Sequence, residues 1–361
     1  MADFQFSRRG FLAAAIAATV SGRSMADPAT GNCPIPIHIV SGGPEEMAAA
    51  YARAMGPTVK TLMPQYVKKF LPPQAYELGL SAGRLFEKFI PADHWAELVA
   101  MAKDAGMAQD EALLGNVFVD LIPTAMCSTI SLSDQASGDH LPRMGRNLDF
   151  PGMGIAEERS VIVVYKPKGR HVFAAVTWPG LLGVLSGMNE HGLCVANMEV
   201  PRRLRPASGV PCMFLYRLLL EQCRTVDEAI DLLKATQRHT ANNLNMIDAK
   251  GGRAVAEIRP EDVTVRRAPA DKPLVATNHH RGTDLATPGR CRRYDTLTRL
   301  AGANWGKIDV AGIERMLNAA SAALTIQSMV FEPTTLTVYL SAGKKAAAGP
   351  FYEINLGKEL K

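Results

Sequence analysis

The stretch MCSTISLS at residues 126–133, followed after a polar turn by RMGRNLDF at residues 143–150, decides the fold of this 361-residue chain. Before it, apolar residues recur every three or four positions, which is typical of helices. After it come short β-branched or alternating runs separated by turn residues, which are typical of strands. The stretch also places Cys127 at the head of a predicted strand, with Arg146 and Asp149 shortly after it.

The helical pattern runs from about residue 44 to residue 121, and five prolines are expected to interrupt it: Pro57, Pro64, Pro72, Pro73 and Pro91. Two further pairs of helices are predicted in the second part of the chain, at residues 212–223 with 226–236 and at residues 292–300 with 310–320. Strands are predicted at residues 160–166, 172–178, 193–198, 244–248, 254–258, 263–267, 274–277, 324–331 and 335–340. Groups of strands separated by paired helices predict a layered α+β fold and not the strict alternation of a Rossmann sheet.

Composition narrows the class of protein only slightly. Hydrophobic residues make up 47% of the chain and charged residues 21%, which excludes a disordered chain and a membrane bundle. The net charge of +5 is spread along the chain, so nucleic-acid binding receives no support.

The N-terminus resembles an export signal. Two adjacent arginines, Arg8 and Arg9, precede an apolar run that is too short to span a bilayer, and a small-x-small site ends at Ala26. We therefore expect a twin-arginine signal at residues 1–26 and a mature protein that is periplasmic or secreted. In that oxidising compartment Cys33 and Cys291 are a candidate disulfide pair, although sequence does not determine connectivity.

Cys127 is a candidate nucleophile, and a nucleophilic thiol requires a base and donors for the oxyanion. Histidines are available, but the chain lacks the local pattern around a papain-type cysteine. The alternative base is the cysteine's own α-amino group, whose ordinary pKa of about 7.7 to 8.0 suits neutral pH. That group becomes free only if the bond between Met126 and Cys127 is cut, which the same thiol can do by attacking the Met126 carbonyl.

Six short motifs, taken in order, resemble the N-terminal-nucleophile amidases, which include bile-salt and penicillin V hydrolases, acid ceramidase and acyl-CoA:isopenicillin N acyltransferase. The motifs are CSTI at 127–130, GRNLDF at 145–150, WPG at 178–180, GMNEHGL at 187–193, NMIDAKGG at 245–252 and ATNHH at 276–280. The resemblance covers residues 127–340. It implies a four-layer αββα sandwich preceded by a helical segment, and thus a helical segment at residues 27–126 and a catalytic segment at residues 127–361.

The resemblance also implies roles for individual residues. Arg146 matches the arginine beside the thiolate, and Asp149 matches the carboxylate that orients the new α-amino group. Asn278 matches the asparagine that stabilises the oxyanion. Arg293 best matches the late arginine of the site, with Arg290 and Arg292 close enough to leave that choice open.

A second oxyanion asparagine is expected shortly after the Gly-Leu pair at residues 192–193. Asn197 is chemically suitable but stands two positions early, and Glu199 occupies the expected place. Asn197 therefore remains a candidate substrate-binding residue.

No metal site and no cofactor are expected. His279 and His280 are adjacent, so on a strand their side chains point to opposite faces, and no further spaced ligand set accompanies them.

The sequence thus predicts a precursor that cleaves itself between Met126 and Cys127, whose two fragments remain associated, and which hydrolyses linear amide bonds of small N-acyl substrates through a thioester on Cys127. Transfer of the acyl group to an amine is the alternative, because only the second nucleophile changes. A thiol enzyme that never cleaves itself and a non-catalytic exported binding protein stay open. The apolar helices before Cys127 are expected to form core or subunit packing, and contact with a membrane is the less favoured interpretation.

Overall fold

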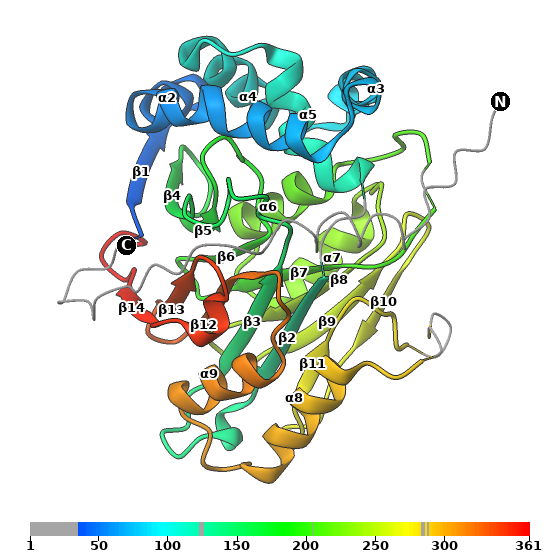
Figure 1. Ribbon diagram of the computed structural model, residues 1–361. Coiled ribbons are helices and arrows are strands. Elements are labelled where there is room, and N and C mark those ends of the chain that lie inside the picture. The colour runs from blue at the N-terminus through cyan, green and yellow to red at the C-terminus, as the bar shows by residue number, and fades with distance from the viewer. Residues whose placement is uncertain (1–34, 123–125, 204, 283–285, 287–288) are drawn as a thin grey trace. The chain divides into compact units, whose positions relative to one another are not determined.

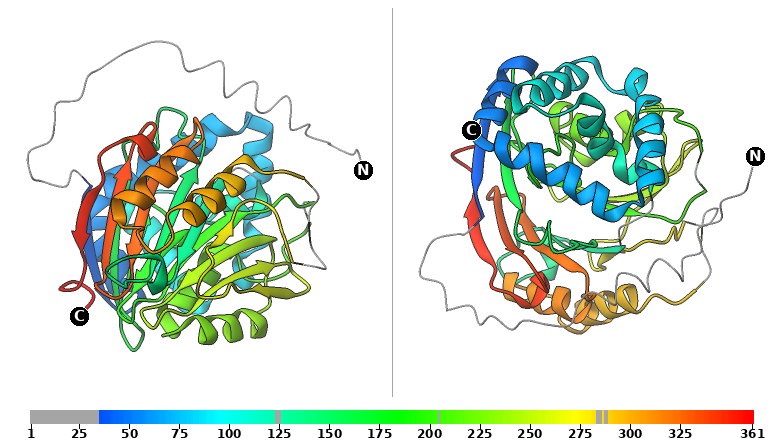
Figure 2. Two further views of the ribbon diagram at one scale, coloured as in Figure 1. Left: turned by 90° about the horizontal axis from the view of Figure 1, so that it is seen from below. Right: turned by 45° about the horizontal axis from the view of Figure 1, so that its top comes forward.

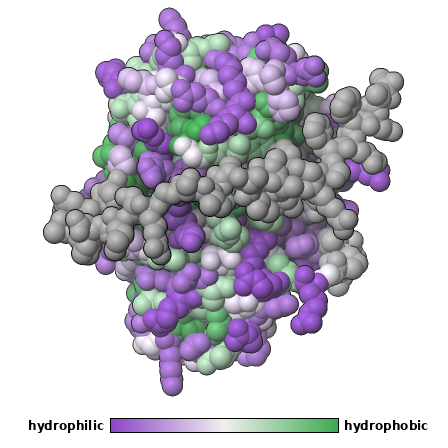
Figure 3. Space-filling view, in the orientation of Figure 1, coloured by the Kyte–Doolittle hydropathy of each residue, from purple (hydrophilic) through white to green (hydrophobic). Residues whose placement is uncertain are grey.

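The computed structural model describes residues 35–122, 126–203, 205–282, 286 and 289–361. Residues 35–361 form one compact unit. No helix in the described part of the chain is long and apolar enough to span a membrane. On the described part of the face in Figure 3, hydrophilic and hydrophobic residues are interspersed. The predicted signal at residues 1–26 and Cys33 lie outside the described residues.

Two sheets form the centre of the described unit (Figure 1). The first sheet has the strand order β1-β4-β5-β6-β7-β8-β9-β10. Its strands are β1 (Ile37–Gly42), β4 (Val161–Pro167), β5 (Phe173–Thr177), β6 (Ser186–Asn189), β7 (Cys194–Glu199), β8 (Asn242–Ile247), β9 (Arg253–Ile258) and β10 (Val263–Arg266). All neighbours in it are antiparallel except β1 and β4.

The second sheet has the strand order β11-β2-β3-β12-β13-β14 and is antiparallel throughout. Its strands are β2 (Met126–Leu132), β3 (Arg143–Asp149), β11 (Leu274–Ala276), β12 (Thr325–Glu332), β13 (Thr337–Ala342) and β14 (Tyr352–Asn355). Strands β2 and β3 are central in this sheet, so the pair has a neighbouring strand at each edge, β11 next to β2 and β12 next to β3. Cys127 lies opposite Leu148 in this pair, and Arg146 lies opposite Thr129.

Paired helices cover the outer face of each sheet, which confirms the predicted αββα layers. Helices α8 (Arg292–Ala303) and α9 (Val310–Ala319) pack on β2, β3, β11 and β12, as the left view of Figure 2 shows. Helices α6 (Cys212–Gln222) and α7 (Val226–Ala235) pack on β6, β7, β9 and β10 of the other sheet. Ile130 and Leu132 of β2 belong to the apolar core beneath α8 and α9.

The first part of the chain adds a further group of helices, α2 (Pro44–Phe70), α3 (Pro73–Arg84), α4 (Ala92–Ala105) and α5 (Gln109–Leu121). Three single turns complete the described elements: η1 (Glu87–Phe89), η2 (Asp134–Ala136) and η3 (Ala346–Ala348). Helix α5 packs against α6, and α2 packs against β1 and β4. The helical segment and the catalytic segment therefore share one large apolar core.

Two of the expected helix breaks are wrong. Pro57 and Pro64 lie inside the continuous helix α2, whereas Pro72 and Pro91 stand at the start of α3 and α4 as predicted. A proline leaves the carbonyl four residues before it without a helical partner. Here those carbonyls belong to Arg53 and Lys60, which are both exposed, so water can satisfy them. The buried face of α2 stays unbroken and holds the helix together.

Strands β1, β3, β6 and β14 were not predicted. β1 precedes the helices and pairs in parallel with β4, so the first segment is not purely helical. β6 reads SGMN and lacks the β-branched residues that indicate a strand. Its neighbours β5 and β7 hold it in the sheet.

Candidate active site

Cys127 lies at the second position of β2 and faces the space between the two sheets. Side chains alternate along a strand, so Cys127 shares a face with Thr129 and Ser131. Those two residues hydrogen-bond the side chain of Asn245 on β8, at 2.9 Å and 2.8 Å. Cys127 itself is 1% exposed, whereas the preceding Met126 is 39% exposed.

Main-chain atoms of Cys127 are held by two side chains that are distant in sequence. Its N–H donates to Oδ1 of Asn278 at 2.8 Å, and its carbonyl accepts from Nη1 of Arg293 at 2.7 Å. Nη2 of Arg293 also donates to Oδ1 of Asn278 at 2.9 Å. The nitrogen that would become the α-amino group is therefore already fixed in the uncleaved chain.

Arg146 lies beside the sulfur. Its Nη2 is 3.8 Å from Sγ of Cys127, and its Nη1 donates to the carbonyl of Asn197 at 2.6 Å. Burial raises the pKa of the Cys127 thiol, and the positive charges of Arg146 and Arg293 oppose that increase. In the uncleaved chain burial has the larger effect, so the thiol is held in its protonated form.

Asp149 stands at the end of β3 with a fully buried side chain. Its Oδ2 accepts from Nη1 of Arg293 at 3.0 Å, and its Oδ1 accepts from Oγ1 of Thr325 at 2.5 Å. Burial raises the pKa of Asp149, while Thr325, Arg293 and Arg146 act in the opposite direction. In the uncleaved chain the side-chain acceptor on the Cys127 nitrogen is Asn278. The role that the resemblance implies for Asp149 concerns the α-amino group that cleavage would free, and it stays a prediction.

The structure distinguishes Arg293 from the other candidate arginines, of which Arg290 is exposed. Arg293 contacts Cys127, Asp149 and Asn278, as described above. Arg292, next to it on α8, instead donates to the carbonyls of Ala319 and Ser321 at the surface. Successive residues of a helix point about a quarter turn or more apart, so only one of the pair can reach the site.

Of the two expected oxyanion donors, Asn278 has another partner in this conformation. Nδ2 of Asn278 donates to the carbonyl of Glu199 at 2.6 Å. Asn197 contributes its main-chain carbonyl to Arg146, and its Oδ1 is buried without a hydrogen-bond partner among the described residues. The carboxylate of Glu199 pairs with Arg202 at 2.8 Å, so Glu199 does not replace the asparagine.

Thr325 was not predicted as a site residue from the sequence. It begins β12, and a register shift between Thr325 and Gln327 places it opposite Asp149. No local pattern marks this residue, because its role depends on strand pairing across 176 positions of the chain.

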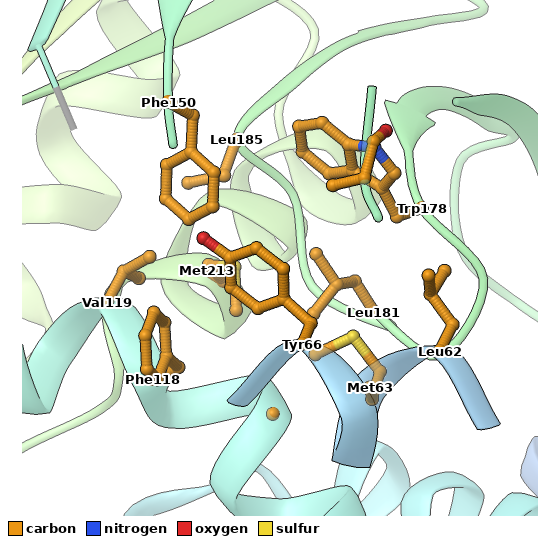
Figure 4. A pocket seen from close by; sticks show the side chains of 12 residues that line it. Leu62, Met63, Tyr66, Phe118, Val119, Phe150, Trp178, Leu181, Leu185 and Met213 are labelled. Atoms are coloured by element: carbon orange, nitrogen blue, oxygen red, sulfur yellow. The ribbon is translucent and has the colours of Figure 1, made fainter. Parts of the chain in front are cut away.

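A small apolar pocket lies at the end of β3, where Phe150 follows Asp149. Figure 4 shows its lining side chains, half of which come from the helical segment before Cys127. Helix α2 supplies Leu62, Met63 and Tyr66; α5 supplies Gly115, Phe118 and Val119; and the catalytic segment supplies Phe150, Ala156, Trp178, Leu181, Leu185 and Met213.

Two links join this pocket to Cys127. Phe150 directly follows Asp149, and the carbonyl of Leu185 accepts from the N–H of Asn197 at 2.9 Å. Cys127, Phe150 and Leu185 also belong to one buried apolar cluster. Both links run through residues next to Asp149 and Asn197, so the pocket adjoins strands that carry the site residues.

Residues 136–304 match the model of the acyl-coenzyme A:6-aminopenicillanic acid acyl-transferase family. The predicted resemblance is thereby confirmed. The matched region begins after Cys127 and contains Arg146, Asp149, Asn278 and Arg293.

Known relatives are distant. An uncharacterized protein of Archaeoglobus fulgidus is 26% identical over 78% of this chain and 57% of its own length. The N-acylethanolamine-hydrolyzing acid amidase of Oryctolagus cuniculus is 27% identical over 47% of this chain and 43% of its own length. The chain thus spans about half the length of the curated relatives it matches. Among solved structures, the Caenorhabditis elegans N-acylethanolamine-hydrolyzing acid amidase ortholog covers 58% of this chain, with 93% of its own chain matched, 20% identity and a TM-score of 0.47.

Proposed function

We propose that this chain is the precursor of a cysteine amide hydrolase that activates itself by cutting the bond between Met126 and Cys127. The observation that carries the proposal is the arrangement at Cys127. A buried thiol lies beside Arg146, and the nitrogen of the same residue is held by Asn278. The match of the following residues to an acyl-transferase family supports the same chemistry.

In the self-cleavage step, the Cys127 sulfur bonds to the Met126 carbonyl carbon and the C–N bond between the residues breaks. The thiol proton moves to the released Cys127 nitrogen, which leaves a thioester and a free amino group. Water then hydrolyses the thioester, so that Met126 ends in a carboxylate and Cys127 regains its thiol. The hydrogen bond from the Cys127 nitrogen to Asn278 keeps the new amino group in place.

In the amide hydrolysis, the α-amino group takes the thiol proton and the sulfur attacks the acyl carbon of the substrate. The C–N bond of the substrate breaks, and the amine leaves with that proton. Water, activated by the same amino group, then attacks the thioester and releases the acyl group as a carboxylic acid. Arg146 stabilises the thiolate that burial disfavours, because its positive charge lies 3.8 Å from the sulfur.

The substrate we propose is a small N-acyl amide with an apolar acyl group. The apolar pocket at the end of β3 is lined by aliphatic and aromatic side chains, which favours burial of an acyl chain over a charged group. The rabbit relative is named as hydrolysing N-acylethanolamines, which are amides of this kind. We also propose export through the twin-arginine signal and continued association of the two fragments, since α2 and α5 share the core of the catalytic segment.

Intact mass and N-terminal sequencing of the purified chain test the self-cleavage. Wild type should yield a fragment that begins at Cys127 and holds 361 − 126 = 235 residues, whereas Cys127→Ala should remain whole. Cys223→Ala is the matched control and should be cleaved like wild type, because Cys223 lies after helix α6 and its main chain bonds to Leu219 and Asn189. Full-length wild type that still hydrolyses amides would contradict the use of the α-amino group as base.

Acyl transfer is the second candidate, and the matched family favours it, since that family is described as an acyl-transferase. Incubation with an N-acyl amide and an excess of a second amine separates the two reactions by product. Free acid alone indicates hydrolysis, and a new amide indicates transfer. A chain that neither cleaves itself nor forms an acyl adduct on Cys127 would be a binding protein.

A further inference from the structure

Three potential metal ligands meet at a place outside the proposed active site. His171 lies just before β5, and Glu190 and His191 lie just after β6. Strands β5 and β6 are antiparallel, with Phe173 opposite Asn189, so the start of one strand adjoins the end of the other. The ligand atoms of these three side chains all lie within 4.8 Å of one another. Within the described part of the chain, this is the group of His, Cys, Asp and Glu residues that could hold a metal ion.

The distances between the three ligand atoms match one face of a zinc tetrahedron. Nδ1 of His171 is 3.2 Å from Oε1 of Glu190 and 3.2 Å from Nε2 of His191. Nε2 of His191 is 3.7 Å from Oε1 of Glu190. Zinc bonds of about 2.0 to 2.2 Å in tetrahedral geometry place ligand atoms about 3.3 to 3.6 Å apart.

Backbone contacts hold the three residues in this arrangement. The N–H of His171 donates to the carbonyl of Glu221 at 3.0 Å, and the N–H of Glu190 donates to the carbonyl of Val172 at 2.9 Å. The N–H of His191 donates to Oδ1 of Asn189 at 3.1 Å. Binding would therefore need little rearrangement of the backbone.

Exposure and charge also favour a cation. The three side chains are 18 to 33% exposed, so a metal can enter and a water molecule can complete its coordination. Glu228 and Arg224 also act electrostatically on His191. Together with Glu190 they put two carboxylates and one guanidinium among the charged groups that act on His191.

We propose that His171, Glu190 and His191 bind Zn²⁺, with water as the fourth ligand. This differs from the expectation of no metal, which considered the adjacent histidines His279 and His280. The site lies at the end of β5 away from Trp178 in the acyl pocket. Seven residues separate His171 from Trp178, or about 23 Å at about 3.3 Å per residue. The metal would therefore stabilise this part of the first sheet without taking part in the thiol chemistry.

Isothermal titration of the full, tag-free chain with zinc chloride, after treatment with a chelator, tests this site. We expect one Zn²⁺ per chain and a higher unfolding temperature in its presence. His171→Gln and His191→Gln should each weaken binding by about 100-fold or more, because loss of a ligand exceeds the 10- to 100-fold effect of losing a supporting contact. His38→Gln is the control, since His38 lies on β1 outside the cluster, and it should bind as wild type does.

The visible spectrum of Co²⁺-loaded wild type provides a second measurement that needs no variant. Tetrahedral coordination should give intense absorption, and X-ray absorption of the zinc-loaded chain should show two imidazole ligands. Absence of stoichiometric binding by wild type, equal affinity in all four proteins, or fewer than two imidazoles would overturn the proposal. None of these results depends on self-cleavage, so the proposed function and the zinc site fail or succeed separately.

Discussion

Replacing Arg293 by methionine should destabilise the uncleaved chain far more than the same change at Arg292. The two residues are neighbours on α8, but only Arg293 contacts the buried carboxylate of Asp149. It also donates to the carbonyl of Cys127 and to Asn278. Both changes are best made in the Cys127→Ala background, so that every chain remains whole and stability is separated from processing.

The size of the effect follows from burial. The Asp149 side chain is 0% exposed and that of Arg293 is 13% exposed, so removing Arg293 leaves a buried charge without its partner. Such a loss costs about 3 to 5 kcal/mol. Arg292 makes only surface hydrogen bonds to two carbonyls, and its loss should cost about 1 kcal/mol or less.

The loss of stability caused by Arg293→Met should also depend on pH. Burial raises the pKa of Asp149 in the folded chain, so ionisation of this group opposes folding, and stability decreases as the pH rises through the folded pKa. Removing Arg293 raises the pKa of Asp149 further, so the decrease in stability with rising pH becomes larger. The difference between Arg293→Met and its parent should therefore shrink as the pH falls and Asp149 becomes protonated in both proteins.

Urea unfolding, followed by tryptophan fluorescence at each pH, measures these differences. Equal midpoints for Arg293→Met and Arg292→Met would refute the reasoning, because the buried pair would then contribute no more than surface contacts. A difference that stays constant with pH would show that lost packing, and not the charge of Asp149, causes the effect.

Three further predictions concern other contacts. Thr325→Val removes the hydroxyl that donates to Asp149, and urea unfolding in the same background should show a loss of about 1.5 to 3 kcal/mol. Arg217→Met should cost about 3 to 5 kcal/mol, since its side chain and its two glutamate partners are at most 5% exposed. The matched change Arg259→Met, in a pair that is 40 and 48% exposed, should cost about 1 kcal/mol or less. Val119→Phe should narrow the acyl pocket and reduce kcat/KM for substrates with long N-acyl chains by about tenfold or more. The kcat/KM for substrates with short chains should be retained. An unchanged dependence of kcat/KM on chain length would place the acyl group elsewhere.

Local pattern predicted the elements well wherever it was strong. Helix α6 and strand β9 begin within a residue of their predicted positions, because apolar periodicity reports directly which face is buried. The errors have specific causes. Pro57 and Pro64 left only exposed carbonyls unpaired, so packing of the buried face of α2 outweighed the local signal. The strand SGMN formed because two neighbouring strands paired with it.

The residues of the candidate site also fall into two groups, those whose proximity follows from local sequence and those whose contacts depend on packing. Cys127, Arg146 and Asp149 lie within one pair of adjacent strands, so their proximity follows from a short stretch of sequence. Asn278 and Arg293 were predicted from the order of family motifs, and the structure brings both to Cys127. Their contacts depend on where β11 and α8 pack against β2.

By itself, the sequence determined the α+β class, the order of the elements and the thiol at the head of a strand, since these depend on residue spacing over short distances. Only the tertiary structure decided that Arg293 and not Arg292 reaches the site, that Thr325 holds Asp149 and that His171 meets His191. Those contacts join residues far apart in the chain. Their geometry is set by strand register and helix packing, and a shift of one residue in either would turn the side chains to the opposite face.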